Sequence, residues 1–433
     1  MDSIGIAGLL IVLLFIILGS GVWIGVALLG VGWIAMEMFT SRPVGPAMVT
    51  TIWGASSSWT LTALPMFIWM GEILFRTRLS EDMFKGLAPW MQRLPGRLIH
   101  TNVIGCTIFA AISGSSAATC ATIGKMSIPE LRKRGYPEGM IVGSLAGSGT
   151  LGLLIPPSLI MIVYGVQTNT SIAQLFIAGV IPGLTLAGLF MITVMIWAMV
   201  EKDRIPAADM AMSFMQKIYA ARHLIPSVAL IVIVLGSIYS GLATATEAAA
   251  VGVAGALLVS IVQGDMNWTV FKESLMGATR LSCMIALILA GAAFLTLAMG
   301  FTGLPRHLAE WIDSLDMSPG MLIFALSAFY IVLGCFLDGI SMVVLTMAVI
   351  MPTIERAGFD LIWFGIFIVI VVEMAQITPP VGFNLFVLQG MTGHQITYIG
   401  KVAFPFFVMM CVMVAALFWF PELATWLPKQ MVG

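Results

Sequence analysis

The chain has 433 residues, of which 60% are hydrophobic and only 9% charged, with a formal net charge of −1 and a mean hydropathy of +1.04. Soluble domains carry about 25% charged residues, so this composition excludes an ordinary soluble protein, and the near-zero charge gives no reason to expect a nucleic-acid partner. Apolar runs that meet or approach the roughly 20 residues needed to cross a bilayer recur at 174–200, 225–241, 281–300 and 402–420. We therefore predict a multi-pass membrane protein.

The first apolar run, residues 5–36, is followed by two basic segments. Gly19-Ser20-Gly21 within the run leaves open whether it forms one tilted helix or two short ones. Segments 76–100 and 125–138 together hold nine basic residues: Arg76, Arg78, Lys85, Arg93, Arg97, Lys125, Arg132, Lys133 and Arg134. Because Lys and Arg accumulate in cytoplasmic loops, we expect both segments on the cytoplasmic side.

The segment between them, 101–124, must then return to the side from which it starts. The run Ser113-Gly114-Ser115-Ser116 lies at its centre, and arms of about 10–12 residues fit a re-entrant hairpin better than a span. The alternative is one full helix with a small-residue packing face, which would place the basic segment 125–138 outside.

The next apolar stretch, 139–165, contains Pro156-Pro157 soon after Gly149 and Gly152. Proline removes a backbone donor and clashes with the preceding turn. Two prolines in succession therefore predict an unwound break, whose freed carbonyl groups need partners or a cavity within the lipid. A simple kink is the alternative.

The second half repeats this spacing of proline, glycine and basic residues at an offset of 223 residues. The correspondences are Pro129 with Pro352, Lys133 with Arg356, Gly135 with Gly358, and Pro156-Pro157 with Pro379-Pro380. The offset predicts a second hairpin over 320–352, with Asp338 at its centre, and a second broken helix over 361–390. A buried aspartate in a membrane segment is costly and indicates function, although capping of the second hairpin arm is compatible with the same position.

The counterparts of the basic segments, 301–319 and 353–360, hold only Arg306 and Arg356. We therefore expect them on the opposite side of the membrane. We also expect five crossings between residues 139 and 300, and an odd number of crossings likewise places these segments on the opposite side. The sequence thus predicts an all-α polytopic membrane protein built from two inverted-topology repeats, residues 1–220 and 221–433.

The two hairpin tips and the two breaks offer oxygen ligands near the bilayer midplane. The tips supply the hydroxyl groups of Ser113, Ser115, Ser116 and Ser341, and the breaks add Thr150, Ser158, Thr378 and Asn384. Such hard, mostly neutral ligands suit an alkali cation, and exposed helix N-termini favour an anionic group. We hypothesise sodium-coupled uptake of a small organic anion. Proton coupling through Asp338, Glu373 or Glu247 is the rival, although Glu247 fits a helix cap equally well.

Four motifs in chain order, covering essentially the whole sequence, resemble the large membrane subunit of tripartite ATP-independent periplasmic (TRAP) transporters. They are Ile112-Ser113-Gly114-Ser115-Ser116-Ala117-Ala118-Thr119, Gly149-x-x-Gly152-x-x-Ile155-Pro156-Pro157-Ser158, Thr246-Glu247-Ala248-Ala249-Ala250-Val251-Gly252 and Thr378-Pro379-Pro380-Val381-Gly382-Phe383-Asn384. The sequence departs from the family at Ala245, where proline often precedes Thr-Glu.

The resemblance implies an elevator-type carrier of the ion-transporter superfamily in the bacterial inner membrane, with scaffold and transport domains interleaved across both halves. It implies Na⁺ as the coupling ion. A first sodium site would comprise Ser113, Gly114, Ser115, Ser116, Gly149, Gly152 and Pro156. A second would comprise Asp338, Gly339, Ser341, Thr378, Pro379 and Gly382. We expect the substrate to contact Ser116, Thr150, Pro157, Ser158, Pro380 and Asn384.

The resemblance also implies two partners, a small four-helix membrane subunit and a periplasmic substrate-binding protein. The delivered ligand would be a carboxylate, a sugar acid such as sialic acid, or a sulfonate. The alternative function is a proton-coupled organic-anion carrier that works without a binding protein. A channel explains hairpins opposite broken helices less well than alternating access does. A membrane enzyme is disfavoured because the chain has no HExxH, GxSxG or paired-aspartate signature.

Overall fold

The computed structural model describes residues 3–207, 212–334, 337–380 and 382–431, and every regular element in these ranges is a helix. Val381 of the second Pro-Pro motif lies outside the described residues. The first half contains, in order, α1 (Ser3–Gly19), α2 (Ile24–Phe39), α3 (Val44–Ser56), α4 (Ala63–Phe75), α5 (Leu79–Met91), α6 (His100–Ser113), α7 (Ser116–Lys133), α8 (Glu138–Thr150), α9 (Leu159–Thr168) and α10 (Ile172–Val200).

The second half follows a matching order of elements. After the polar α11 (Phe214–Ala221), the apolar pair α12 (Ile225–Tyr239) and α13 (Ala245–Val262) is followed by the long α14 (Trp268–Thr302) and the polar α15 (Leu304–Ser314). Then come α16 (Pro319–Leu333) and α17 (Gly339–Arg356), the two helices that flank Pro-Pro, α18 (Leu361–Gln376) and α19 (Phe383–Thr392), the further long helix α20 (Ile396–Trp419) and the terminal α21 (Glu422–Met431).

The first apolar run forms two short helices, α1 and α2, rather than one tilted helix. Within the described residues, six helical segments are long and apolar enough to cross a membrane, or seven when the bent pair α3–α4 counts as one span. The six are α10, α11 with α12, α13, α14, α17 and α20. These helices, together with the shorter apolar ones, confirm the prediction of a multi-pass membrane protein.

The predicted breaks and hairpins differ from the structure mainly in the length of their second arms. Helices α8 and α9 flank Pro156-Pro157, and α18 and α19 flank Pro379-Pro380, close to the expected bounds. The second arms α7 and α17 each have 18 residues, more than the 10–12 expected. Each arm continues through a proline, Pro129 or Pro352, into the polar segment that was expected to be a loop.

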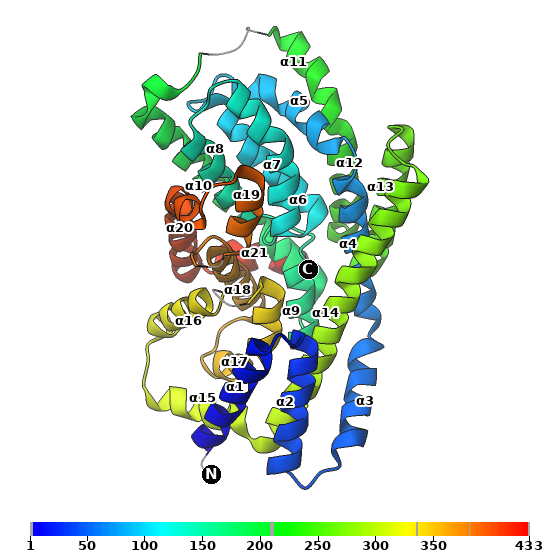
Figure 1. Cartoon of the computed structure of the whole chain (residues 1–433), viewed down its shortest axis with the longest axis vertical. Coiled ribbons are helices and arrows are strands. Elements are labelled where there is room, and N and C mark those ends of the chain that lie inside the picture. The colour runs from blue at the N-terminus through cyan, green and yellow to red at the C-terminus, as the bar shows by residue number, and fades with distance from the viewer. Residues whose placement is uncertain (1–2, 208–211, 335–336, 381, 432–433) are drawn as a thin grey trace.

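The long helices and the hairpins occupy different parts of the molecule. Helix α14 packs along α2, α3 and α4, and α13 packs against α4. Helices α6 and α7 pack on each other and on α8, whereas α17 packs on α9 and α18. Figure 1 shows α6 and α7 in the upper half of the molecule and α16 and α17 in the lower half, with α9 and α18 between them.

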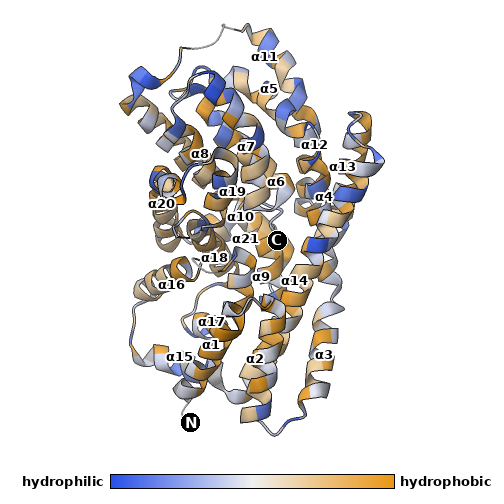
Figure 2. Ribbon diagram, in the orientation of Figure 1, coloured by the Kyte–Doolittle hydropathy of each residue, from blue (hydrophilic) through white to orange (hydrophobic). Residues whose placement is uncertain are grey.

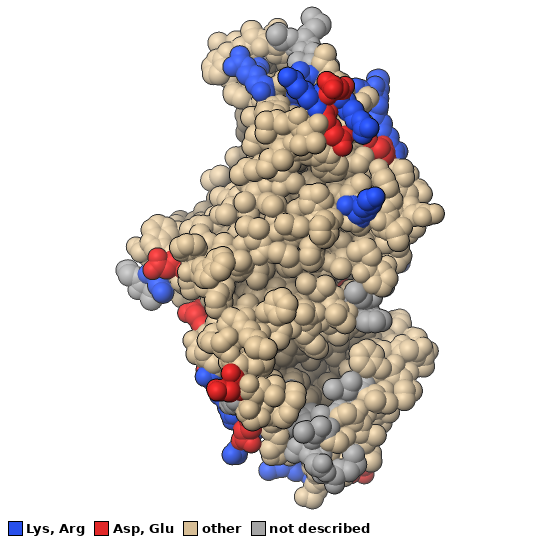
Figure 3. Space-filling view, turned by 90° about the vertical axis from the view of Figure 1, so that its left-hand side faces the viewer, with Lys and Arg blue, Asp and Glu red and all other residues tan. Residues whose placement is uncertain are grey.

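Charged side chains gather at the two ends of the molecule. Figure 2 shows the most polar helices, including α5 and α11, at the upper end. In Figure 3 most Lys and Arg lie at that end, a smaller charged group lies at the lower end, and the broad band between them is almost free of charge. Such a band matches the hydrocarbon core of a bilayer, where charges are costly.

Candidate functional site

The tip of the first hairpin packs directly on the first Pro-Pro break. Gly114 ends α6 with a φ of 61°, a left-handed conformation that glycine adopts without a steric penalty. Its carbonyl oxygen accepts a hydrogen bond from the Leu159 N–H at 3.2 Å. A methyl group at Gly152 would lie 2.5 Å from the Ser115 carbonyl oxygen and 2.6 Å from the Thr119 hydroxyl. The contact therefore requires glycine at position 152.

The hydroxyl groups of this tip form a small buried network. The Ser113 and Thr119 hydroxyl oxygens are 2.7 Å apart, and Ser115 accepts from the Ala118 N–H as the N-cap of α7. Ser113 and Ser116 are buried with them. Thr119 was not predicted as a site residue. Its place three residues after Ser116 on the same helix face is the sequence signal that could have identified it.

The first break leaves main-chain oxygens without partners. Residues 151–158 are not helical, and no described main-chain N–H bonds to the carbonyl oxygens of residues 152–157. Ser158 is an N-cap that accepts from the Met161 N–H. The Thr150 hydroxyl instead donates to the Gly147 carbonyl at 2.7 Å. The Thr150 hydroxyl is thus directed into its own helix, although we expected it to point into the break and contact the substrate.

The second tip is organised by Asp338. Its carboxylate accepts from the N–H groups of Ile340 at 3.1 Å and Ser341 at 3.3 Å, and from the Ser341 hydroxyl. The adjacent Gly339 lies so close to α18 that a methyl group there would be 2.6 Å from a Val372 methyl carbon. Asp338 therefore caps α17, as the structural alternative proposed, and it places a carboxylate at the tip.

Both hairpin tips meet the first turn of α9. Gly114 of the first tip bonds to the Leu159 N–H, and a methyl group at Gly339 of the second tip would lie 2.9 Å from the Ile160 Cδ1. The two tips are far apart in the sequence, so α9 is the element that brings the first and second predicted sites together.

Gln376 links the second tip to the second break. Its amide nitrogen lies beside Gly339, and its carbonyl oxygen lies beside Gly382. Thr378 donates its hydroxyl to the Met374 carbonyl at 2.6 Å. No hydrogen bond between described residues joins Thr378 to Asp338 directly. Gln376, which was not predicted, therefore adjoins both parts of the second site, Gly339 through its side-chain nitrogen and Gly382 through its main-chain carbonyl oxygen.

Two buried polar side chains near the breaks have no hydrogen-bond partner. Neither carboxylate oxygen of Glu373 and neither side-chain atom of Asn384 is satisfied among the described residues, and both residues are fully buried. Buried polar groups are nearly always paired, so these unpaired atoms beside the breaks are candidate ligand contacts. Glu373 faces the peptide of Leu154 in the first break. Glu247, in contrast, is exposed and forms a capping box with Thr244.

The two breaks differ in exposure. Pro156 and Pro157 are buried, whereas Pro379 and Pro380 are exposed and Thr378 is partly exposed. Both Pro-Pro peptide bonds are cis. The second break is therefore the more accessible of the two in this structure.

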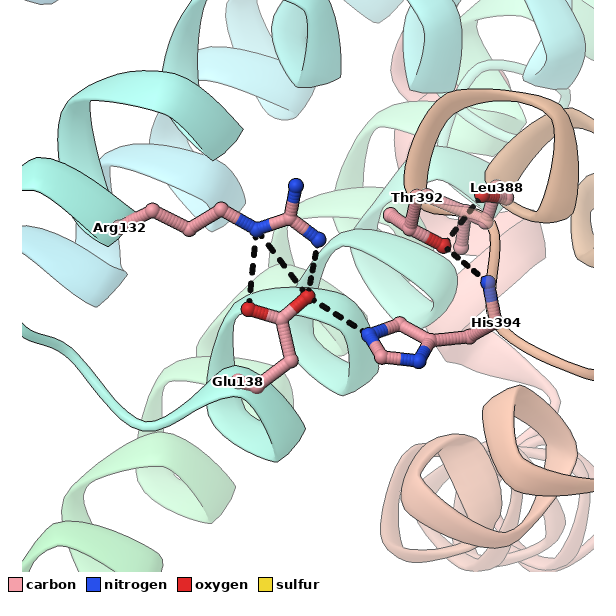
Figure 4. Close-up of polar contacts among 5 residues, drawn as sticks. All are labelled: Arg132, Glu138, Leu388, Thr392 and His394. Atoms are coloured by element: carbon pink, nitrogen blue, oxygen red, sulfur yellow. Dashed lines mark hydrogen bonds and ion pairs between the residues drawn. The ribbon is translucent and has the colours of Figure 1, made fainter.

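A polar cluster joins the two halves at the basic end of the molecule (Figure 4). Glu138, at the start of α8, accepts from the Arg132 Nε at 3.0 Å, and its Oε1 lies 2.9 Å from the His394 Nε2. The hydrogen bond from Arg132, assisted by His394, holds the pKa of Glu138 below its ordinary value. His394 lies between α19 and α20, so the cluster ties the first half to the second.

Comparison with known proteins gives a family match over nearly the whole chain. The family model described as "Tripartite ATP-independent periplasmic transporter, DctM component" matches residues 9–423. The C4-dicarboxylate TRAP transporter large permease protein DctM of Pseudomonas aeruginosa is 32% identical over 386 residues, which cover 89% of this chain and 90% of that protein. The 2,3-diketo-L-gulonate TRAP transporter large permease protein YiaN of Escherichia coli is 28% identical, covering 87% and 88%.

Solved structures of two other transporters share the fold at low sequence identity. The Alcanivorax borkumensis YdaH transporter matches with a TM-score of 0.62 at 12% identity, covering 94% of this chain and 97% of that one. Neisseria gonorrhoeae MtrF matches with a TM-score of 0.51 at 11% identity, covering 92% and 93%. These likenesses extend to the arrangement of helices alone.

Replacing Gly152 by alanine should destabilise the protein, because the added methyl group collides with the backbone of the first tip. Overpacking of this kind costs about 1–3 kcal/mol. We expect a lower Tm of the purified protein and a loss of transport. Gly188→Ala on α10 is the matched control, since a methyl group there meets nothing within 4 Å. Equal Tm values for the two variants would contradict the tip contact.

Glu138→Gln should lower the Tm at neutral pH, because the folded state holds the charged form of Glu138. Its pKa is lowered on folding, so its stabilisation is present above the unfolded-state pKa of about 4.3 and is lost as pH falls through the folded pKa. Partly exposed ion pairs contribute about 1 kcal/mol or less. The Tm gap from the wild type should close in acid. A gap that stays constant with pH would refute the electrostatic origin, and Glu422→Gln serves as control.

Proposed function

The chain belongs to the DctM family of TRAP transporter large permeases, and we propose that it couples the uptake of a small organic anion to sodium. As a member of this family it is a multi-pass protein of the bacterial inner membrane and a permease for secondary transport of organic acids rather than an enzyme. The observation that carries the sodium proposal is the docking of the first hairpin tip on a break with unpaired carbonyl groups.

A TRAP large permease works with a small membrane subunit and a periplasmic binding protein. The isethionate TRAP transporter permease protein DctMQ of Oleidesulfovibrio alaskensis is 29% identical over 404 residues, which cover 92% of this chain but 62% of that protein. We propose that the small subunit packs on the long helices α2–α4, α13 and α14, and that a binding protein delivers the substrate.

Sodium binding is supported by the oxygen atoms gathered at the two tips. At the first, the Ser113 and Thr119 hydroxyls contact each other, and a methyl group at Gly114 would lie 2.7 Å from the Pro157 carbonyl oxygen of the break. At the second, the Asp338 carboxylate accepts from the Ser341 hydroxyl, and the neighbouring Gly339 lies close to Gln376. Neutral oxygens with one carboxylate suit a monovalent cation, and half-helix ends with unwound backbone are typical of sodium sites in carriers.

Binding of an anionic substrate is supported by the helix N-termini at the breaks. Helices α9 and α19 begin at Leu159 and Phe383, next to the breaks, and the positive end of a helix dipole favours a negative group. The N-cap of α19, Gly382, makes no side-chain hydrogen bond to the first turn of that helix. The unpaired Asn384 side chain lies one residue inside α19 and offers a further amide donor. The names of relatives, for C4-dicarboxylate, 2,3-diketo-L-gulonate and isethionate, support a proposed class that includes carboxylates, sugar acids and sulfonates.

Elevator alternating access through two inverted repeats is supported by the division of contacts. The hairpins pack on the interrupted helices, and α14, α2, α4 and α13 pack on one another, while α6 also contacts α4 and α17 also contacts α14. The two hairpins lie in opposite halves of the molecule (Figure 1). We propose that the hairpins and interrupted helices move together as the transport domain against a scaffold that includes the long helices.

A proton-coupled carrier working without a binding protein is the second candidate. The observation that favours it is the fully buried Glu373 carboxyl, whose oxygens are unpaired beside the first break. Intramembrane carboxyl groups of this kind serve as proton relays in carriers.

Asp338→Asn should raise the sodium concentration that gives half-maximal uptake at least about tenfold, or about 1.4 kcal/mol in binding free energy. Asparagine keeps the N-cap of α17 but removes the charge, so the variant separates capping from ion binding. The measurement is initial uptake of a labelled organic anion into proteoliposomes, with the cognate small subunit and binding protein present.

The matched control is Asp360→Asn, because Asp360 caps α18 with the same pattern of N–H donors but lies away from the tips. We expect its sodium dependence to equal that of the wild type. Uptake driven fully by an imposed proton gradient without sodium would contradict the sodium proposal and favour the second candidate. If uptake depends on the sodium concentration identically in both variants, Asp338 serves only as the N-cap of α17.

A further inference from the structure

A charged groove lies away from the tips, at the basic end of the molecule. It has a volume of about 840 Å³ and is formed by α5, α7 and α11 together with Met212 just before α11. Five cations line it: Lys85 of α5, Arg93 just after α5, Lys125 of α7, Arg134 just after α7, and Lys217 of α11. None of the proposed sodium or substrate residues reaches this groove.

The groove has an excess of positive charge. Its lining includes only two acids, Glu81 and Glu130, and Arg134 is paired with Glu130 at 3.3 Å. Lys85, Arg93 and Lys125 are exposed and form no ion pair with the described residues. Unpaired cations that converge on one hollow attract an anion such as a phosphate group.

Large apolar side chains flank the cations on α5 and α11. Trp90 and Phe214 contact each other edge to face, with ring centroids 6.2 Å apart, and Phe214 and Met215 are 68% and 71% exposed. Polar and apolar faces on one helix are typical of segments that lie in the membrane interface, and tryptophan concentrates at that depth. The anion in the groove would therefore adjoin lipid.

From the volume, the charge excess and the apolar border we propose that this groove binds the phosphate head group of an anionic membrane phospholipid. Basic pockets between helices at this level of a membrane protein bind such head groups. A free phosphate could satisfy the same cations, but it would leave the exposed Trp90, Phe214 and Met215 side chains without a partner. A bound lipid would connect α7, the second arm of the first hairpin, to α5 and α11.

The test compares lipids by their effect on the Tm of the purified protein in detergent. Phosphatidylglycerol should raise the Tm, as any ligand that binds the folded state does, and phosphatidylcholine should not. In the triple variant Lys85→Gln, Arg93→Gln, Lys125→Gln, the phosphatidylglycerol concentration for half the shift should rise at least about tenfold, since each cation contributes to head-group binding.

Two further triple variants control for charge and folding. Lys202→Gln, Lys272→Gln, Lys401→Gln removes the same charge from exposed sites outside the groove and should respond as the wild type does. Lys85→Arg, Arg93→Lys, Lys125→Arg keeps the groove charge and should retain the response. If the glutamine variant in the groove does not fold, the test rests on the wild-type protein, whose Tm should rise with phosphatidylglycerol and not with phosphatidylcholine.

Three results would overturn the proposal. These are equal responses of the wild type to the two lipids, an unchanged response in the groove glutamine variant, and equal losses in the groove variant and the outside variant. Inorganic phosphate is the remaining probe, and we expect no Tm shift from it at millimolar concentration. A phosphate shift as large as that of phosphatidylglycerol would assign the groove to a soluble anion and would also overturn the lipid proposal.

Discussion

In a bilayer an unpaired carbonyl group finds no water, so every interruption of a helix must be covered by other protein groups or must line a cavity. At the first Pro-Pro break, the six carbonyl groups of residues 152–157 have no main-chain partner among the residues that the structure describes, and the first hairpin tip covers the break. That cover depends on two residues without side chains, Gly114 and Gly152. The position of the Ser113 and Thr119 hydroxyls and the start of α9 follow from this one close approach.

The second tip obeys the same constraint with different residues. Asp338 stands where the first tip has Ser115 at the 223-residue offset, and it caps its helix with a carboxylate instead of a hydroxyl. Gly339 permits the tip to approach α18. Both tips contact the first turn of α9, so this helix joins the two tips structurally. Because Pro379 and Pro380 are exposed, the second break is more accessible than the first.

The order of the elements could be predicted because proline, glycine and basic residues act locally, on the chain next to them. Pro156-Pro157 and Gly114 marked a break and a turn that the structure contains at those positions. Contacts between distant segments could not be predicted in this way, since periodicity gives no side-chain direction at a break. For this reason the direction of Thr150, which donates into its own helix, and the role of Gln376 were not predicted.

The central claim is that each hairpin enters and leaves the membrane on one side. The most direct measurement is labelling of single cysteines, introduced at Trp90, Lys133, Ser314 and Glu355 in a cysteine-free background, with a membrane-impermeant maleimide in oriented vesicles. All four positions are exposed. Positions 90 and 133 should react from one side, and 314 and 355 from the other. Reaction of 90 and 133 from opposite sides would make α6 and α7 a crossing and would contradict the proposed site.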